Sequence, residues 1–451
     1  MGFIDATVSS LAVSSMRESL DASLSEVQWI SNAYLLMLSA LVLVGGSFGD
    51  RFGLARVFGL GIVLFMIAAL TCALSPSAEV LIAARGLQGT GAALMVPGSL
   101  AIISRAYPKE IRGRAIGIWA AASSIVTAAG PIFGGLALSF GDADVWRWIF
   151  AFYLPLGALT LWLLARAIET DQKQPDRGVD LLGAALAAIG LWLIAWSLTG
   201  TGNHSVLPGY AGLGCLVLLI FLWVESRTPA PMLDLGLFED RGFSAVNLMT
   251  FVFYFGFLAV LFYLPMTVIA GWGLLEIEAA AAFAPLPIFI GGFSTLAGKL
   301  ADRHGPRPLL TLGCLCAGIG FAALALVFPY QQFWTMVLPA TICLGIGMAM
   351  IVAPLSTAVM GAVGDENSGA ASGVNNAVSR MAGLFAVAAF GSIAATVYAQ
   401  NGGTVSYGAI SDAPGHVAAM DKGFAAICWV AAGLALLSAA ITWFGVPAKR
   451  R

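Results

Sequence analysis

Hydrophobic residues occur along this chain in runs of about 20, separated by short segments that hold most of the charged and turn-forming residues. A helix of about 20 residues crosses the roughly 30 Å hydrocarbon core of a bilayer. The pattern predicts thirteen membrane-spanning helices, at residues 26–48, 56–74, 79–104, 113–139, 146–167, 180–200, 206–225, 243–270, 277–300, 308–328, 333–361, 368–398 and 421–444. Residues 1–14 form a shorter apolar stretch, and residues 15–26 are expected to be an external loop.

Composition supports a membrane protein made of helices. The chain is 59% hydrophobic and 10% charged, with a mean hydropathy of +0.90. Soluble domains carry roughly 25% charged residues. We therefore expect an all-α polytopic membrane protein. The formal net charge of −2 argues against a nucleic-acid partner.

The residues that usually carry enzyme or metal chemistry are scattered. The six cysteines lie in apolar segments, and none pairs with one of the three histidines at metal-ligand spacing. We expect reduced cysteines that pack in the core, no metal site and no cofactor. No Gly-x-x-x-x-Gly-Lys-Ser/Thr loop occurs, so ATP is not expected to drive this protein. The prediction is a protein that is not an enzyme and has no catalytic residues.

Lysine and arginine predict the orientation, because basic residues gather in the short cytoplasmic loops of membrane proteins. If the loop after Asp50 is cytoplasmic, only Arg17, Arg147 and Lys422 remain outside. Both termini are then cytoplasmic. The basic residues on the cytoplasmic side are Arg51, Arg56, Arg105, Lys109, Arg112, Arg114, Arg166, Lys173, Arg177, Arg227, Arg241, Lys299, Arg303, Arg307 and Lys449–Arg451.

A repeat divides the chain into two related halves. Gly46-Ser-Phe-Gly-Asp50-Arg51-Phe-Gly53 returns as Gly298-Lys-Leu-Ala-Asp302-Arg303-His-Gly305, 252 positions later. Each copy predicts a tight charged turn between two helices. Glycines at 89, 91, 113 and 117 return 256 positions later. Duplicated halves of this kind are typical of transporters.

The spacing of the repeat predicts three parts. Six helices with their loops need about 200 residues, so an offset of about 250 leaves two extra helices. We predict a first six-helix bundle at 1–167, two inserted helices with cytoplasmic linkers at 168–241, and a second bundle at 242–451. The equivalent of residue 242 falls about ten residues before Met1. Because residues 1–14 reach only about 21 Å as a helix, we expect the first span to be incomplete, by truncation or a misassigned start.

Five motifs resemble those of the major facilitator superfamily and, within it, the fourteen-helix drug/proton antiporters. The turn at Gly46–Arg56 resembles the signature loop of the superfamily. The other motifs are Arg85-Gly-Leu-Gln88-Gly89, Ala129-Gly130-Pro131-Ile-Phe-Gly134-Gly135, Gln28-Trp29 with Ala33-Tyr34 and Trp146-Arg147-Trp148-Ile149-Phe150, and Asp5-Ala-Thr7-Val8. The resemblance implies two six-helix bundles plus two inserted helices, a bacterial cytoplasmic membrane, a monomer, and exchange of a small molecule for protons.

The chain departs from this resemblance at several positions. Leu54 and Ala55 stand where the signature loop usually has basic residues, and Val126 and Tyr153 replace a glycine and an asparagine. Residues 368–398 hold no carboxylate, which argues against doubly charged cationic substrates.

Asp5 and Arg85 are the candidates for proton coupling. A membrane-embedded carboxylate can take up a proton because burial disfavours its charged form. Asp5 is the acidic residue that the pattern places inside a helix, and the resemblance implies that it binds the proton. Arg85 lies within a helix and is expected to influence Asp5. The alternatives are that Asp5 faces cytoplasmic water and that Arg85 anchors the structure.

Two further motifs predict the conformational machinery. The resemblance implies a latch formed by Gly46, Asp50, Arg51, Gly53 and Arg56, with Asp302 and Arg303 as the second copy. We expect Asp50 to cap the following helix or to pair with Arg112 or Arg114. Gly130, Pro131, Gly134 and Gly135 predict a kinked, closely packed helix, which the resemblance associates with antiport. The alternatives are ordinary turn chemistry and an ordinary kink.

The substrate site is predicted only as a set of candidates. A cavity between two transporter halves is lined by polar and aromatic side chains of the central helices, and aromatic faces suit flat lipophilic cations. The candidates are Asn32, Tyr34, Gln88, Trp119, Tyr254, Tyr263, Asn376 and Arg380.

The sequence therefore predicts proton-coupled export of small lipophilic compounds by alternating access. Two alternatives stay open. One is export of a specific metabolite or siderophore by the same fold, and the other is a membrane sensor or inactive relic that transports nothing.

Overall fold

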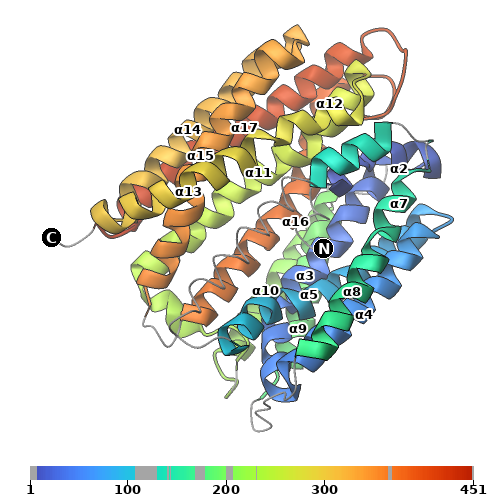
Figure 1. The fold of residues 1–451 in the computed structure, drawn as a ribbon. Helices are drawn as coiled ribbons and strands as arrows, with labels where there is room; N and C mark the ends of the chain where they lie inside the picture. Colours follow the sequence, from blue (N-terminus) through green and yellow to red (C-terminus); the bar gives the residue numbers. More distant parts are fainter. Residues whose placement is uncertain are drawn as a thin grey trace. The chain divides into compact units, whose positions relative to one another are not determined.

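The described residues form mainly long helices (Figure 1). The structure, a computed structural model, describes residues 8–106, 130–139, 142, 144–167, 178–199, 207–229, 231–363 and 368–448. Within these residues, twelve helices are long and apolar enough to cross a membrane. They correspond to twelve of the thirteen predicted spans. The remaining span, 113–139, lies mostly outside the described residues, which include its last part as the helix Gly130–Ser139.

The structure describes these helices in chain order. Their bounds are α2 Val13–Leu20, α3 Leu24–Phe52, α4 Leu54–Ala73, α5 Ala78–Ala106, α7 Trp146–Ala151, α8 Tyr153–Ala167, α9 Leu181–Thr199, α10 Pro208–Glu225, α11 Arg241–Trp272, α12 Glu276–Ala280, α13 Pro285–His304, α14 Pro306–Val327, α15 Leu338–Gly361, α16 Ser368–Gln400 and α17 His416–Gly445.

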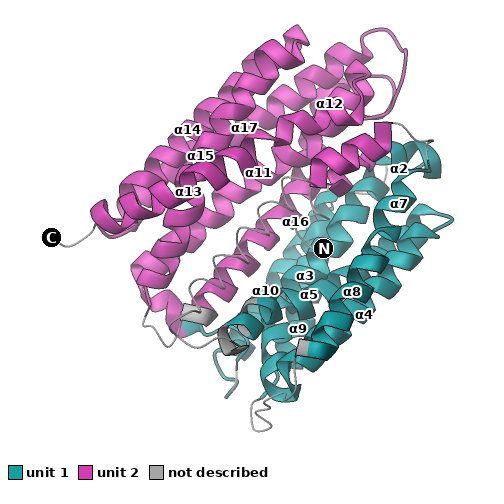
Figure 2. Ribbon diagram, viewed as in Figure 1, with its two compact units in different colours: residues 1–6, 15–123, 142–235 teal, residues 7–14, 124–141, 236–451 magenta. Residues whose placement is uncertain are grey.

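The chain forms two compact units, coloured separately in Figure 2. Unit 1 comprises residues 1–6, 15–123 and 142–235, and it contains α9 and α10. Unit 2 comprises residues 7–14, 124–141 and 236–451. The division into two bundles and a two-helix insert at 168–241 stays a proposal.

The predicted repeat appears as matching glycine contacts inside each unit. In unit 1, a Cβ on Gly61 would lie 2.9 Å from the Gly91 carbonyl oxygen, so α4 and α5 touch through their backbones. In unit 2, a Cβ on Gly313 would lie 2.9 Å from the Gly347 carbonyl oxygen, between α14 and α15. These glycine pairs are related by the sequence offsets of 252 and 256. Small residues allow such close approach of membrane helices.

The charged turns are shorter than the sequence predicts. Helix α3 continues through Asp50 to Phe52, and a single residue, Gly53, joins it to α4. Gly305 does the same between α13 and α14. Gly53 has φ 107° and Gly305 has φ 86°, values that L side chains rarely adopt. Each glycine N–H still donates to the carbonyl oxygen four residues earlier, at 3.1 Å and 2.7 Å.

The prediction of an external loop at residues 15–26 is wrong, because most of these residues are helical. Helix α2 reaches Leu20, and α3 begins at Leu24. Ser23 caps α3: its hydroxyl accepts from the Glu26 N–H, while the Glu26 carboxylate accepts from the Ser23 N–H at 2.7 Å. This capping box starts the helix within the segment whose polar residues suggested a loop.

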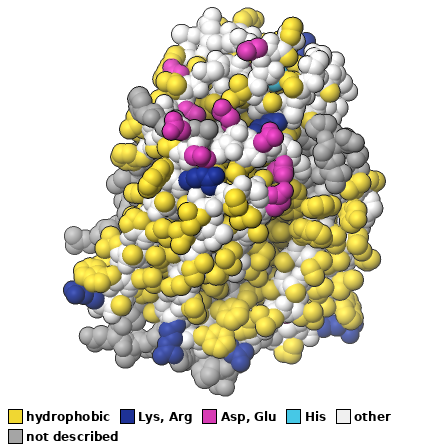
Figure 3. Space-filling view, turned by 90° about the vertical axis from the view of Figure 1, so that its right-hand side faces the viewer, with side chains coloured by type: hydrophobic (Ala, Val, Ile, Leu, Met, Phe, Trp, Pro, Cys, Tyr) yellow, Lys and Arg dark blue, Asp and Glu magenta, His cyan; other side chains and the backbone are white. Residues whose placement is uncertain are grey.

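The outer faces of many helices are apolar. Exposed side chains include Leu60 and Ile67 on α4 and Leu219 and Trp223 on α10. On the face shown in Figure 3, hydrophobic side chains cover most of the lower part, and Lys and Arg side chains occur along its lower edge. Exposed apolar surface on this scale marks contact with lipid.

Candidate functional site in unit 1 and its counterpart in unit 2

Arg85 lies at the centre of a buried polar site in unit 1. It belongs to α5, and only 2% of its surface is exposed. Its Nε donates to the Ile30 carbonyl oxygen at 3.1 Å, and its Nη1 donates to Gln88 Oε1 at 2.6 Å. The guanidinium carbon lies 4.5 Å from the Tyr34 ring centroid and 5.6 Å from that of Phe150. Two oxygens of neutral groups and two aromatic rings of the described residues thus contact the cation.

These partners offset the cost of an intramembrane charge. An arginine at the centre of a bilayer costs roughly 2.5–3.5 kcal/mol on insertion scales. Hydrogen bonds that involve a charged group contribute about 1.5–3 kcal/mol each, and a cation–π contact in a desolvated place about 2 kcal/mol. The two hydrogen bonds of Arg85 are therefore enough to hold it in place. Asp5 lies outside the described residues, so its pairing with Arg85 stays a prediction.

Two side-chain amides next to Arg85 keep unused hydrogen-bonding capacity. Asn32 is fully buried, and neither its Nδ2 nor its Oδ1 has a hydrogen-bond partner. Gln88 is fully buried too, and its Nε2 has none. An unsatisfied buried group costs about 1–3 kcal/mol. Such groups favour a polar ligand, a water molecule or a proton carrier at this site.

Close packing of α3 and α5 builds this site. A side chain at Gly89 would collide with the carbonyl oxygen of Tyr34, and one at Gly45 with that of Ala93. Gly46, which the sequence singles out, has room for a methyl group, because its nearest neighbour, a Pro97 side-chain atom, would be 3.9 Å away. The close approach therefore depends on Gly45 and Gly89, and Gly46 is not needed for it.

The Trp146–Phe150 motif joins α7 to the α4–α5 connection. Arg147 Nη1 donates to the Ser75 carbonyl oxygen at 2.6 Å, and its Nε donates to Asp144 Oδ1 at 3.0 Å. Hydrogen bonds from Ser19 and Arg147 lower the pKa of Asp144, so this carboxylate stays ionised near neutral pH. Phe150 from the same motif packs over Arg85.

The latch residues differ between the two copies. Asp50 is half-buried in the last turn of α3, whereas Asp302 is exposed in α13. The N-cap residue of α4 is Gly53, and the expectation that Asp50 caps this helix or pairs with Arg112 or Arg114 stays a prediction. Arg112 and Arg114 lie outside the described residues. Arg51 lies 5.4 Å from the Phe52 ring, and Arg56 and Arg303 are exposed.

The glycines of the predicted antiporter motif lie at close contacts within unit 2. A Cβ on Gly134 would lie 2.6 Å from Val8 Cγ1, and one on Gly135 would lie 2.9 Å from the Glu276 carbonyl oxygen. Gly130 and Pro131 are buried at the start of the described helix. The residues before Gly130 lie outside the described range, so the predicted kink at Pro131 stays a prediction.

Unit 2 holds a second polar site, between α11 and α16. Arg380 Nε donates to Asn376 Oδ1 at 3.4 Å. Tyr254 of α11 lies near Arg380 and interacts with its charge. The neighbouring Asn375 donates to Asn247 Oδ1 at 3.1 Å and to Thr250 Oγ1 at 2.9 Å. The structure thus brings Arg380, Asn376 and Tyr254 together, as it does Arg85 and Gln88 in unit 1.

The remaining substrate candidates lie apart from these sites. Tyr263 is fully buried, and its hydroxyl donates to the Val387 carbonyl oxygen at 2.6 Å, so it joins α11 to α16 in the packed core of unit 2. Trp119 lies outside the described residues.

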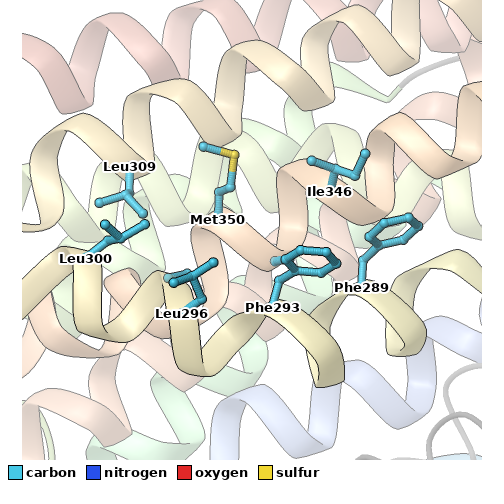
Figure 4. A pocket seen from close by; sticks show the side chains of 9 residues that line it. Phe289, Phe293, Leu296, Leu300, Leu309, Ile346 and Met350 are labelled. Atoms are coloured by element: carbon cyan, nitrogen blue, oxygen red, sulfur yellow. The ribbon is translucent and has the colours of Figure 1, made fainter.

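An apolar pocket in unit 2 is a feature that the sequence analysis missed. Its volume is about 260 Å³, and nine side chains of α13, α14 and α15 line it, seven of which are labelled in Figure 4. Phe289, Phe293, Leu296 and Leu300 form one edge of it. They follow each other at intervals of four, three and four residues, which places them on one face of α13. That spacing is the signal in the sequence that marks the pocket.

Sequence reasoning also missed Asp421 in α17. It is 2% exposed and accepts hydrogen bonds from Trp272 Nε1 and Gln331 Nε2, each at 2.8 Å. It therefore ties the end of α11 and the loop after α14 to α17. The sequence pattern placed Asp421 at a helix start, where a solvated carboxylate is common, so its burial was not expected.

The described residues that could bind a metal ion, and the cysteines, are dispersed. No group of three or more His, Cys, Asp or Glu side chains is placed to hold a metal ion there. All six cysteines are free, and Cys72, Cys314 and Cys428 are buried; Cys215 is exposed, so the expectation that it packs in the core is wrong.

Comparison with known proteins shows the family. Residues 1–387 match the model of the Major Facilitator Superfamily. The chain is 32% identical to a methylenomycin A resistance protein of Streptomyces coelicolor, over 87% of this chain and 82% of that protein. It is 32% identical to the puromycin resistance protein pur8 of Streptomyces alboniger, over 99% of this chain and 89% of that protein. It is 33% identical to the uncharacterized MFS-type transporter Rv1250 of Mycobacterium tuberculosis, over 84% of this chain and 66% of that protein.

The fold agrees with this relationship. A bacterial homologue of the human lysosomal transporter Spinster superposes with a TM-score of 0.70 at 17% identity, covering 98% of this chain and 94% of that one. The chain is thus related to drug and antibiotic resistance proteins in sequence and to transporters in fold, and it belongs to the major facilitator superfamily of multi-pass membrane transporters.

Proposed function

We propose that this protein exports small lipophilic compounds, cationic ones included, in exchange for protons across a bacterial cytoplasmic membrane. The observation that carries the proposal is the buried Arg85 site. A buried, membrane-embedded cation beside amides with unused hydrogen-bonding atoms supports an ion or proton pathway. The resistance relatives supply the substrate class.

Within this proposal, the chain has fourteen spans in a six, two, six arrangement, as in the drug/proton antiporters that its motifs resemble. Asp5 binds the proton, and Arg85 influences when the proton leaves. The Asp50 and Asp302 turns act as a conformational latch, and the half-buried first copy is the more important of the two. The basic loops and both termini face the cytoplasm. The protein works as a monomer.

The apolar pocket is the proposed place for the lipophilic part of a substrate. Its lining is apolar and partly aromatic, and two of its rings, Phe289 and Phe293, are stacked 5.7 Å apart. Pockets that bind drug-sized ligands have about this volume or more and are lined mainly by such residues. The polar groups around Arg380 in the same unit would contact the rest of the substrate.

Filling the pocket is expected to reduce transport of bulky substrates. Leu296→Trp places a large ring among the lining residues, and we expect transport of large lipophilic compounds to fall about tenfold, the effect of losing about 1.4 kcal/mol of binding. Small compounds should be less affected. Ile288→Trp is the matched control, because Ile288 is on the same helix, is 65% exposed and does not line the pocket. Equal losses in both variants would contradict the assignment.

The proposed function is tested in inside-out vesicles with an acid interior and a pH-sensitive dye. Addition of a lipophilic cation should release protons from the lumen, because export moves the compound inward and the proton outward. Collapsing the gradient with a protonophore should abolish accumulation of the compound. If no compound of a broad panel of lipophilic compounds releases protons, the proposed export of such compounds is contradicted. If protons are released only by one metabolite or siderophore, the protein is instead an exporter of that specific compound.

A further inference from the structure

Two acidic side chains lie at the open end of the hairpin of α9 and α10, where α9 begins and α10 ends. Asp180 directly precedes α9 and is 8% exposed, and Glu225 is the last residue of α10 and is 2% exposed. The helices pack closely: a Cβ on Gly214 would lie 2.9 Å from the Gly190 carbonyl oxygen. The hairpin thus brings both carboxyl groups to the same buried place.

One oxygen of each carboxyl group is satisfied by the backbone. Asp180 Oδ1 accepts from the Gly183 N–H at 2.7 Å, and Glu225 Oε2 accepts from the Leu233 N–H at 3.0 Å. The other two oxygens, Asp180 Oδ2 and Glu225 Oε1, are buried and have no hydrogen-bond donor. Both lie beside Gly183, where a single Cβ would collide with each of them. These two orphaned oxygens therefore lie close to each other.

No basic side chain of the described residues neutralises this pair. Helix α9 carries no charged residue, and Glu225 is the one charged residue of α10. Among the described residues, Asp180 is the charged group that acts on Glu225. Arg227, close by in sequence, lies over the Trp223 ring with its guanidinium carbon 4.9 Å from the centroid. Other charged residues on the packed elements are Glu26, Asp50 and Arg51 on α3 and Asp234, Glu239 and Asp240 after α10.

Two bare carboxylates in such a place repel each other strongly, and one of them keeps its proton. The retained proton turns the repulsion into a short O–H···O hydrogen bond between the two orphaned oxygens. We propose that Asp180 and Glu225 bind one proton between them and that this shared proton holds the start of α9 and the end of α10 together. The pair shares no residue with the Arg85 site, and the proposal does not depend on the proposed transport function.

The proposal fixes the direction of a pH dependence. The folded protein holds a proton that free carboxyl groups of an unfolded chain release near neutral pH. Stability must therefore fall as pH rises and the shared proton leaves. We expect the thermal midpoint of the purified protein in detergent to fall by several degrees between mildly acidic and alkaline pH.

Matched variants separate this pair from every other carboxyl group. Glu225→Gln supplies a permanent N–H donor to Asp180, so the variant should keep the acidic-pH midpoint and lose much of the alkaline fall. Asp180→Asn should have the same effect, because its amide N–H would donate to Glu225. Glu239→Gln makes the same change at an exposed position after α10 and should follow the wild type. If both pair variants keep the full wild-type pH dependence, the proposal is overturned.

Infrared spectroscopy observes the proton directly and keeps the test valid if one variant folds poorly. The wild type near neutral pH should show the carbonyl stretching band of a protonated carboxyl group. Glu225→Gln and Asp180→Asn should each weaken this band, and Glu239→Gln should leave it intact. Absence of the band in the wild type, or a band that neither pair variant reduces, overturns the shared proton.

Discussion

Asp5→Asn is expected to reduce proton release in the vesicle assay to the level of vesicles without the protein. The asparagine amide has nearly the shape of the carboxyl group but cannot take up or lose a proton in this pH range. If Asp5 is the coupling group, the exchange of substrate for protons stops, while binding of the substrate need not change. Exchange of labelled for unlabelled substrate, which moves no net proton, should therefore persist in the variant.

Asp21→Asn is the matched control for this variant. Asp21 is exposed and has φ 49°, a conformation that asparagine adopts as readily as aspartate, so the substitution should leave both the fold and proton release unchanged. Full proton-coupled export by Asp5→Asn would show that Asp5 only faces cytoplasmic water. Loss of both proton release and substrate exchange would instead indicate a damaged protein.

Arg85→Met is expected to lower proton-coupled transport at least tenfold with a much smaller change in stability. The substitution removes two charge-assisted hydrogen bonds, each contributing about 1.5–3 kcal/mol. It also removes the roughly 2.5–3.5 kcal/mol that an arginine costs within the bilayer. The second term offsets much of the first, and methionine fills much of the same space beside Tyr34 and Phe150. Transport should suffer because the positive charge that influences Asp5 is gone.

The measurement is the rate of proton release as a function of pH, taken together with the thermal midpoint of each variant. Arg85→Lys keeps the charge but not the planar fork that reaches Gln88 and Ile30 together, so we expect intermediate rates and a displaced pH profile. If Arg85→Lys leaves the rate and pH profile unchanged, and Arg85→Met loses activity only in proportion to lost folded protein, Arg85 is a structural anchor.

Much of the fold could be predicted from the sequence, because an apolar run of about 20 residues has few alternatives to a membrane helix. Twelve predicted spans are present in the described residues. The sequence predicts the signature turn at the right place, but the turn is shorter than predicted, because α3 continues to Phe52. Small and charged residues around Asp50 suggested a turn, yet the hydrogen-bond ladder of α3 continues until Gly53, the residue whose backbone must leave the right-handed region.

The candidate site was predicted less completely. Arg85 stands out in the sequence because a charge within an apolar helix is costly and needs partners. Its partners are a backbone carbonyl of α3, a ring of α7 and the amide of Gln88. Only the last is close in sequence. The pair of Asp180 and Glu225 is 45 residues apart, and each residue by itself reads as an ordinary carboxylate at a helix end.

The sequence by itself determined that this is a polytopic helical membrane protein with a repeated half, since hydropathy and glycine spacing act locally and are read directly from the residues. Only the tertiary structure decided which polar groups meet. Burial depends on how closely helices approach, and that approach is set by single glycines such as Gly45, Gly89 and Gly214 against backbone atoms of another helix. The same carboxylate is a solvated helix end or a proton-binding site according to that packing.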